Sequence, residues 1–105
     1  MRESVFQKQI KNELKIRFPG CYVYKTDAQQ IQGSPDLLVL YKDKWAALEV
    51  KRNQKEAEKS ERGDGHPNQG YRVRQMNEMS FAAYIFPENK EEVLDGLERL
   101  FRPKE

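Results

Sequence analysis

Hydrophobic residues recur along the chain with two different periods. Apolar residues spaced three and four positions apart predict helices over residues 2–17, 67–79 and 89–101. Short runs of apolar, aromatic and β-branched residues predict strands over residues 21–25, 36–41, 44–51 and 81–86. The expected order is α-β-β-β-α-β-α, an α/β fold in which a four-stranded mixed β-sheet is flanked by helices. Because the two middle strands are apolar at nearly every position, we expect helices on both faces of the sheet.

Residues 52–66 interrupt this pattern. The segment RNQKEAEKSERGDGH is highly charged, has two glycines near its end and lacks an apolar stripe. It is therefore expected to be a mobile charged loop with at most a frayed helical turn. A chain of 105 residues suits one compact domain, so we expect residues 1–105 to form a single domain.

The composition excludes several kinds of chemistry. Cys21 is the only cysteine and His66 the only histidine, which excludes an intrachain disulfide, a Cys-rich zinc site and Ser-His-Asp or Cys-His catalysis within one chain. A catalytic site must then be built from carboxylates, lysines and amides. The N-terminal residues lack the apolar core of a signal peptide, and no run approaches the roughly 20 apolar residues of a membrane span, so an intracellular, cytoplasmic location is expected.

The pairing of the two middle strands brings three charged side chains together. If Tyr41 pairs with Lys44, then Asp36 faces Glu49 across the hairpin. Directly opposed residues point to the same face of a sheet, and Lys51 shares that face because it lies two residues beyond Glu49. Two opposed carboxylates repel each other, and Lys51 offsets only part of their charge.

Two interpretations fit these three residues. Lys51 could form an ordinary strand-end salt bridge with one acid. Alternatively, a divalent cation completes the site, because hard cations such as Mg²⁺ take oxygen ligands, and the carbonyl group of Val50 could supply one more. Glu3 lies within the apolar stripe of the first helix and Gln69 on the core side of another, which favours the cation because polar groups on apolar faces need partners. Glu3 could also be a terminal acid favoured by the helix dipole, and Gln69 a satisfied buried amide.

These residues resemble the PD-(D/E)xK nuclease superfamily. Pro35-Asp36 and Glu49-Val50-Lys51 are similar to its PD…ExK signature. The fuller pattern adds an acid at the start of the first helix (Glu3), GSPD, LEVK and a helix that carries Gln69, and it is closest to the VRR-NUC type; archaeal Holliday-junction resolvases share a similar layout. The resemblance covers residues 3 to about 86 and implies a restriction-endonuclease-like core. The chain departs from it in the long charged segment after Lys51 and in the junction before the last strand, which lacks a glycine.

The resemblance implies a Mg²⁺- or Mn²⁺-dependent DNA endonuclease, structure-selective or nicking, that leaves a 5′-phosphate and a 3′-hydroxyl. Asp36, Glu49 and the Val50 carbonyl would bind the metal ion, and Glu3 would contact it directly or through water. Lys51 would position the attacking water and stabilise charge on the phosphate. Gln69 would orient Lys51 or the water.

The expected partner is branched or duplex DNA. The candidate DNA contacts are Lys8, Lys11, Lys15, Arg52, Lys55 and Arg72. A small nuclease that cuts two strands often needs two active sites, so a homodimer is expected. Two alternatives remain open at this stage. One is a catalytically inactive nucleic-acid-binding module of the same fold, and the other is a structural, partner-binding α/β domain in which the three charged residues form a salt bridge.

Overall fold

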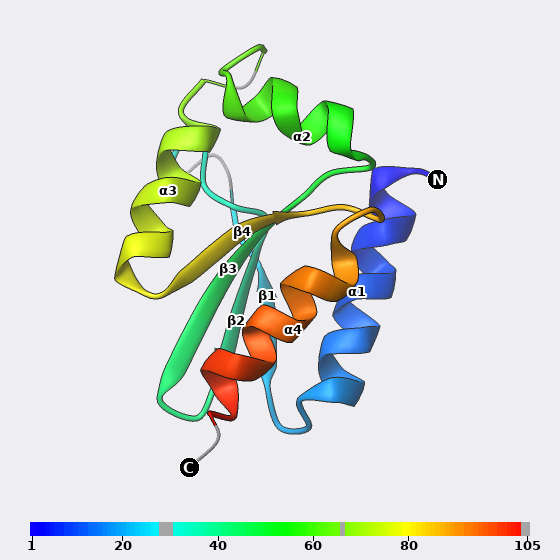
Figure 1. Ribbon diagram of the computed structural model, residues 1–105, viewed down its shortest axis with the longest axis vertical. Coiled ribbons are helices and arrows are strands. Elements are labelled where there is room, and N and C mark those ends of the chain that lie inside the picture. Colours follow the sequence, from blue (N-terminus) through cyan, green and yellow to red (C-terminus); the bar gives the residue numbers. More distant parts are fainter. Residues whose placement is uncertain (28–30, 66, 104–105) are drawn as a thin grey trace.

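The computed structural model, which describes residues 1–27, 31–65 and 67–103, has a mixed sheet between helices (Figure 1). The helices are α1 (Glu3–Arg17), α2 (Gln54–Glu61), α3 (Gln69–Met79) and α4 (Lys90–Phe101). The strands are β1 (Tyr22–Lys25), β2 (Leu37–Tyr41), β3 (Lys44–Val50) and β4 (Phe81–Ile85). The four-stranded sheet has the order β1-β2-β3-β4, in which β4 lies parallel to β3 and the other pairs are antiparallel. The predicted α/β fold is confirmed, with one helix more than expected.

That additional helix, α2, corrects the prediction of a mobile loop over residues 52–66. Asn53 caps the helix, because its side chain accepts a hydrogen bond of 2.9 Å from the backbone N–H of Glu56. The segment is rich in strong helix formers, and the helix buries Ser60 against the rest of the domain. The helix is almost wholly polar, so it has no apolar periodicity by which it could be predicted. His66, the last residue of the segment, lies outside the described residues.

The hairpin between β2 and β3 has the predicted register. Tyr41 pairs with Lys44, and Lys42 in the turn between them adopts a left-handed φ of 57°. Such turns match the twist of paired strands and fix the register beyond them. One residue beyond the last pair of this ladder, Asp36 stands opposite Glu49.

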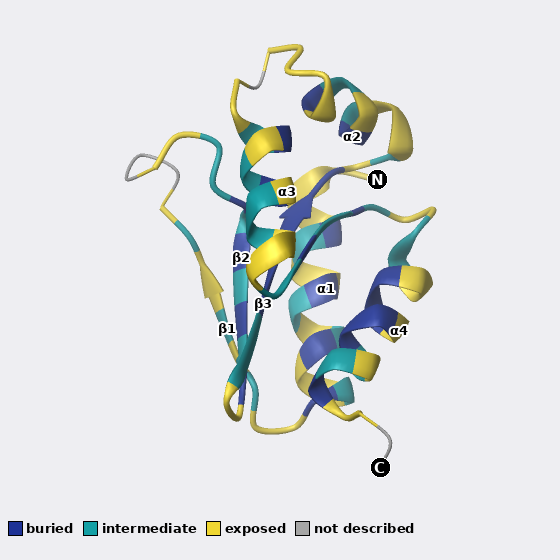
Figure 2. Cartoon of the chain, turned by 60° about the vertical axis from the view of Figure 1, so that its left-hand side comes forward, coloured by how far each residue is buried: buried dark blue, intermediate teal, exposed yellow. Residues whose placement is uncertain are grey.

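Helices α1 and α4 pack on one face of the sheet and build the main core. The core side chains alternate along the strands, so that this face of β2 is buried throughout (Figure 2). Its largest fully buried members are Phe6, Ile10, Leu14, Phe18, Leu37, Leu48, Ile85, Leu94 and Leu97. The opposite face carries a smaller cluster in which Val73 of α3 meets Ala47 of β3 and Ala82 of β4. The second face is thus covered by α3 over β3 and β4.

None of the helices within residues 1–27, 31–65 and 67–103 has the length and apolar character needed to cross a membrane.

Candidate functional site

The side chains of Asp36, Glu49 and Lys51 meet at the end of the β2–β3 hairpin, on the face that α3 partly covers. Asp36 Oδ2 accepts a hydrogen bond of 2.9 Å from the backbone N–H of Val50. The Lys51 ammonium nitrogen lies 3.4 Å from Glu49 Oε2. The structure therefore brings together the three charged residues that the hairpin register indicated.

Glu49 is the most unusual ionisable group of this cluster. Its residue is only 2% exposed, and its Oε1 atom is buried without a hydrogen-bond partner among the described residues. Burial, together with the nearby carboxyl group of Asp36, raises the pKa of Glu49 to about 8, although Lys51 acts in the opposite direction. Because a buried oxygen without a partner is costly, this position favours either a bound proton or a bound cation.

The Val50 carbonyl lacks a partner in the β2–β3 ladder, because the residue that would stand opposite Val50 is a proline. The N–H and C=O groups of one strand residue point towards the same neighbouring strand, and the N–H of Val50 points to Asp36. If the ladder continued, the residue opposite Val50 would be Pro35, which has no N–H to donate. Thr26 holds the other strand end in place, because its backbone N–H donates to the Asp36 carbonyl at 2.8 Å. Two carboxylates and a backbone carbonyl thus offer oxygen atoms at the same end of the hairpin.

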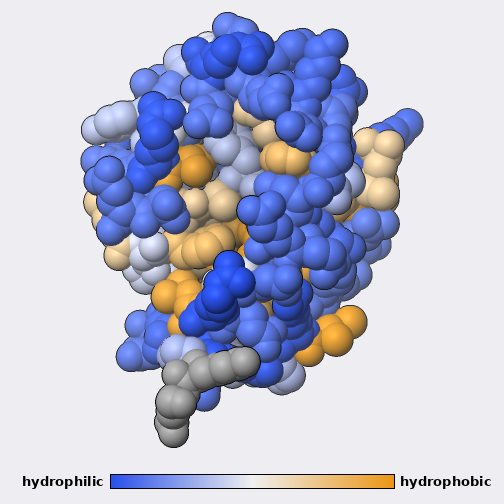
Figure 3. All heavy atoms as spheres, viewed as in Figure 1, coloured by the Kyte–Doolittle hydropathy of each residue, from blue (hydrophilic) through white to orange (hydrophobic). Residues whose placement is uncertain are grey.

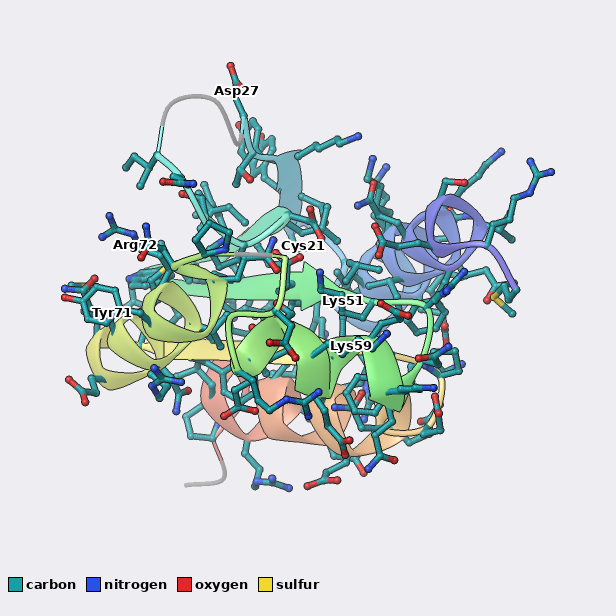
Figure 4. The ribbon with its side chains drawn as sticks, turned by 90° about the horizontal axis from the view of Figure 1, so that it is seen from above. Cys21, Asp27, Lys51, Lys59, Tyr71 and Arg72 are labelled. Carbon is teal, nitrogen blue, oxygen red and sulfur yellow. The ribbon has the colours of Figure 1, made fainter. Side chains whose placement is uncertain are left out.

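An open cleft of about 470 Å³ surrounds this cluster. Its lining residues are Arg2, Glu3, Asp36, Glu49, Lys51, Arg52, Glu56 and Gln69. In Figure 4, Lys51 lies at the end of β3 beside α2. The predicted residues Glu3 and Gln69 therefore reach the same cleft as the three charged residues, from α1 and α3 respectively.

Glu3 lies at the exposed start of α1, not within the buried cluster. In the described parts of the chain, no three His, Cys, Asp or Glu side chains are grouped so that they could hold one metal ion. A cation in the cleft would therefore take its protein ligands from Asp36, Glu49 and the Val50 carbonyl. Of the two predicted roles for Glu3, the contact through water fits its position better than the direct bond.

Two residues that the sequence analysis missed hold Gln69 in place. Ser60 of α2 is fully buried and donates a hydrogen bond to the side-chain carbonyl of Gln69. Since a hydroxyl has one proton, Tyr84 must donate the 2.9 Å bond that joins it to Ser60. Tyr84 pairs with Glu49 across β3 and β4, so it belongs to the same face. Because the side-chain carbonyl of Gln69 is bonded to Ser60, the amide N–H groups of Gln69 are left to donate hydrogen bonds to a ligand in the cleft.

Two close backbone contacts hold the first turn of α3. Gly33, in the loop before Asp36, lies close to Asn68, and a Cβ added to Gly33 would come within 2.7 Å of the Asn68 backbone. On the other side, an added Cβ at Gly70 would come within 2.6 Å of the Glu61 carbonyl oxygen at the end of α2. Asn68 itself adopts a left-handed φ of 73°, so α3 begins at Gln69, two residues later than predicted.

We expect Gly33→Ala to impair the site more than it impairs folding. The matched control is Gly63→Ala, because both glycines have a positive φ, of 84° and 87°, but Gly63 has nothing within 4 Å of an added Cβ. Both variants should lose about 1 kcal/mol of stability from the unfavourable backbone, and Gly33→Ala should lose more, because its Cβ would meet the Asn68 backbone. Only Gly33→Ala should push the start of α3 outward, and a displacement of about 1 Å at Gln69 should lower the DNA cleavage that the sequence resemblance implies by about 100-fold. Urea unfolding measures the loss of stability and a DNA-cleavage assay measures the second effect. Equal cleavage by both variants would show that the contact is unimportant.

The structure distributes the predicted DNA-contacting residues unevenly. Arg52 lines the cleft and is 3.2 Å from Glu56, and Lys55 is exposed on α2. Arg72 on α3 contacts the Gln32 carbonyl in the loop before Asp36, at 3.5 Å. The three lysines of α1 lie progressively farther from the cleft, at axial distances from Glu3 of roughly 8, 12 and 18 Å at 1.5 Å per residue. They are Lys8, Lys11 and Lys15.

A second hollow, between α2 and α4, has a different character. It runs along the open edge of β4 and is lined by apolar side chains that include Phe81, Ala83 and Val93. Figure 3 shows apolar residues exposed in this region of an otherwise hydrophilic face. The opposed acids and the buried lysine line only the first cleft. Searches with this chain found no matching protein-family model, curated protein or solved structure, so its function is inferred from the chemistry of that cleft.

Proposed function

We propose that this protein is a metal-dependent nuclease of the PD-(D/E)xK class that hydrolyses phosphodiester bonds in DNA. The observation that carries the proposal is the buried Glu49, which faces Asp36, touches Lys51 and has one oxygen without a partner among the described residues. A structural salt bridge needs one acid and one base. It would explain neither the second acid nor the unsatisfied oxygen of Glu49.

The available ligands suit a hard divalent cation. Asp36, Glu49 and the Val50 carbonyl offer oxygen atoms, which Mg²⁺ and Mn²⁺ prefer, and Mg²⁺ ordinarily keeps several waters in addition. When bound, such an ion lowers the pKa of its water and screens the phosphate oxygens that repel a nucleophile. A site with few protein ligands that opens into a cleft leaves coordination positions for water and substrate.

The remaining residues of the cleft have roles that follow from their positions. The buried ammonium group of Lys51 stabilises negative charge that develops on the phosphate, and burial strengthens this interaction because water screens it less. Gln69 donates hydrogen bonds from its amide, which orient the attacking water or a phosphate oxygen. Arg52, at the edge of the cleft, offers a planar guanidinium group to the phosphate backbone.

The test is a cleavage panel with four-way-junction, flap, duplex and single-stranded DNA, each with Mg²⁺, Mn²⁺ or EDTA. The wild-type protein is expected to cut at least one of these substrates only when a divalent ion is present. Lys51→Ala, with Lys51→Met as a variant closer in volume, should lose about 100-fold to 1,000-fold in rate while it still binds DNA. The absence of metal-dependent cleavage across the whole panel would refute the nuclease assignment, and so would wild-type turnover by both lysine variants.

A further inference from the structure

Two tyrosines stand exposed on strand β1. Tyr22 and Tyr24 are 65% and 51% exposed, and their rings are nearly parallel, with an interplanar angle of 14° and centroids 6.2 Å apart. Large aromatic side chains on a strand usually pack against neighbours, but Tyr22 and Tyr24 belong to neither hydrophobic cluster of the described residues. Their exposure points to a binding role.

The two rings share a face of the sheet with the candidate active site. Tyr24 pairs with Leu38, so both point to one face, and Asp36 joins them because it lies two residues before Leu38. Thr26 stands opposite Asp36, as the hydrogen bond between their backbones shows. At about 3.4 Å per residue, Tyr24 and Tyr22 lie roughly 7 and 14 Å along the strand from that position. The tyrosines therefore form a row that leads to the cleft.

Among the described residues, this part of the face remains open, and a cation borders it. Helix α3 packs over β3 and β4, and Figure 2 shows β1 at the edge of the sheet with exposed residues. Across the opening, the loop from β1 to β2 is bonded to Arg72 of α3. A polyanion that passes from Tyr22 towards Asp36 would meet this cation. Lys25 of β1 is also exposed, but it points to the opposite face, because it pairs with the core residue Leu37.

We propose that Tyr22 and Tyr24 stack on unpaired bases, so that the substrate is a nucleic acid with a single-stranded segment next to the bond that is cut. This inference rests on the proposed nuclease function and specifies its substrate class. Only unpaired bases expose their ring faces to a flat aromatic surface, whereas duplex offers its edges and phosphates. Exposed aromatics on a sheet are known to stack on successive bases in single-stranded recognition.

A second copy of the chain fits the same surface less well. The strand has four residues, and a stable interface between copies usually buries about 1,000 Å² or more in total. Binding of a nucleic acid strand requires no such large area.

The test compares binding of fluorescent 12-nucleotide oligo(dT) and of a 12-base-pair blunt duplex by anisotropy, in EDTA so that nothing is cut. The variant is Tyr22→Ala combined with Tyr24→Ala. The control is Ile16→Ala, which removes a large side chain that is 79% exposed on α1, on the other face of the sheet. Because stacking contributes roughly 5-fold to 150-fold per base, the double variant should bind oligo(dT) at least about 10-fold more weakly than wild type. Its duplex affinity should change less than about twofold, and Ile16→Ala should change neither affinity.

Three results would overturn the inference. Oligo(dT) binding unaffected by the double substitution would exclude stacking, and so would an equal loss of duplex and oligo(dT) affinity. A wild-type dimer that becomes a monomer in the double variant, measured by sedimentation, would assign the tyrosines to an interface between copies. None of these results contradicts the nuclease proposal as long as the wild-type protein still cuts a DNA substrate of the cleavage panel in the presence of a divalent ion. Failure of the stacking proposal is therefore distinguishable from failure of the nuclease proposal.

Discussion

Replacing Glu49 by Gln is expected to abolish metal-dependent cleavage while the protein stays folded. The substitution keeps the shape of the side chain and removes the charge that a cation requires. A catalytic metal contributes several kcal/mol to the transition state, and about 1.4 kcal/mol corresponds to a tenfold change in rate, so the loss should reach about 1,000-fold or more. Asp36→Asn should have a similar effect, because it removes the opposing carboxylate.

The control for this experiment is Glu92→Gln, which removes an exposed acid on α4, across the sheet from the cleft. It changes the net charge equally and should leave cleavage at the wild-type rate. The same proteins are melted with and without Mn²⁺, since a ligand that binds only the folded state raises its melting temperature. The melting temperature of the wild type should rise with Mn²⁺, and that of Glu49→Gln should not. Cleavage by Glu49→Gln within tenfold of the wild-type rate would exclude Glu49 as a metal ligand.

The site also shows which features of a structure are encoded locally. The opposition of Asp36 and Glu49 was predictable, because strands have a period of two and a short turn fixes the register of a hairpin. The position of Lys51 on the same face was predictable too, because Lys51 lies two residues after Glu49. Pro35 adds a further local signal, since a residue without an N–H at the strand end leaves the Val50 carbonyl without its ladder partner. One hairpin therefore specifies most of the chemistry in the cleft.

The support around Gln69 could not be predicted in the same way. Ser60 reaches it from a helix whose sequence is almost wholly polar, and Tyr84 reaches it from a strand joined to β3 by parallel pairing. Both contacts depend on how α2, α3 and β4 pack, and single-chain periodicity does not encode that packing. The cap formed by Asn53 and the run of helix formers after it were the available signals for α2. Gly33 was visible in the sequence, but its contact with Asn68 became evident only from the fold.

The tyrosines of β1 also combine a feature that the local sequence encodes with one that depends on packing. Their strand was predicted, and parity alone places both tyrosines on one face, but only the register between β1 and β2 makes this the face of Asp36. Whether a helix covers them depends on the position of α3, which lies over β3 and β4 instead. The proposed path of the substrate depends on this position, because the described residues leave the strip of the sheet beside the two acids uncovered.

We expect the metal-free protein to lose stability as the pH rises from about 5 to about 8. The pKa of Glu49 is about 8 in the folded protein and 4.5 for an ordinary glutamate, so in this window the folded state holds a proton that the unfolded state has released. The stabilisation is complete below about pH 4.5 and is lost as the pH rises through the folded-state pKa. Each pH unit should cost at most about 1.4 kcal/mol from this one group.

Urea unfolding in EDTA, at unit steps from pH 5 to pH 9, measures this slope. Glu49→Gln is the control, because its amide does not titrate and its stability should depend less on pH than that of the wild type. Saturating Mg²⁺ should remove most of the wild-type loss, since a cation between Asp36 and Glu49 takes the place of the proton. The apparent Mg²⁺ affinity should then increase up to about tenfold per pH unit below pH 8. Parallel pH profiles for wild type and Glu49→Gln would contradict the raised pKa. A wild-type slope that Mg²⁺ leaves unchanged would mean that proton and cation do not compete for one site, and the metal centre would have to lie elsewhere.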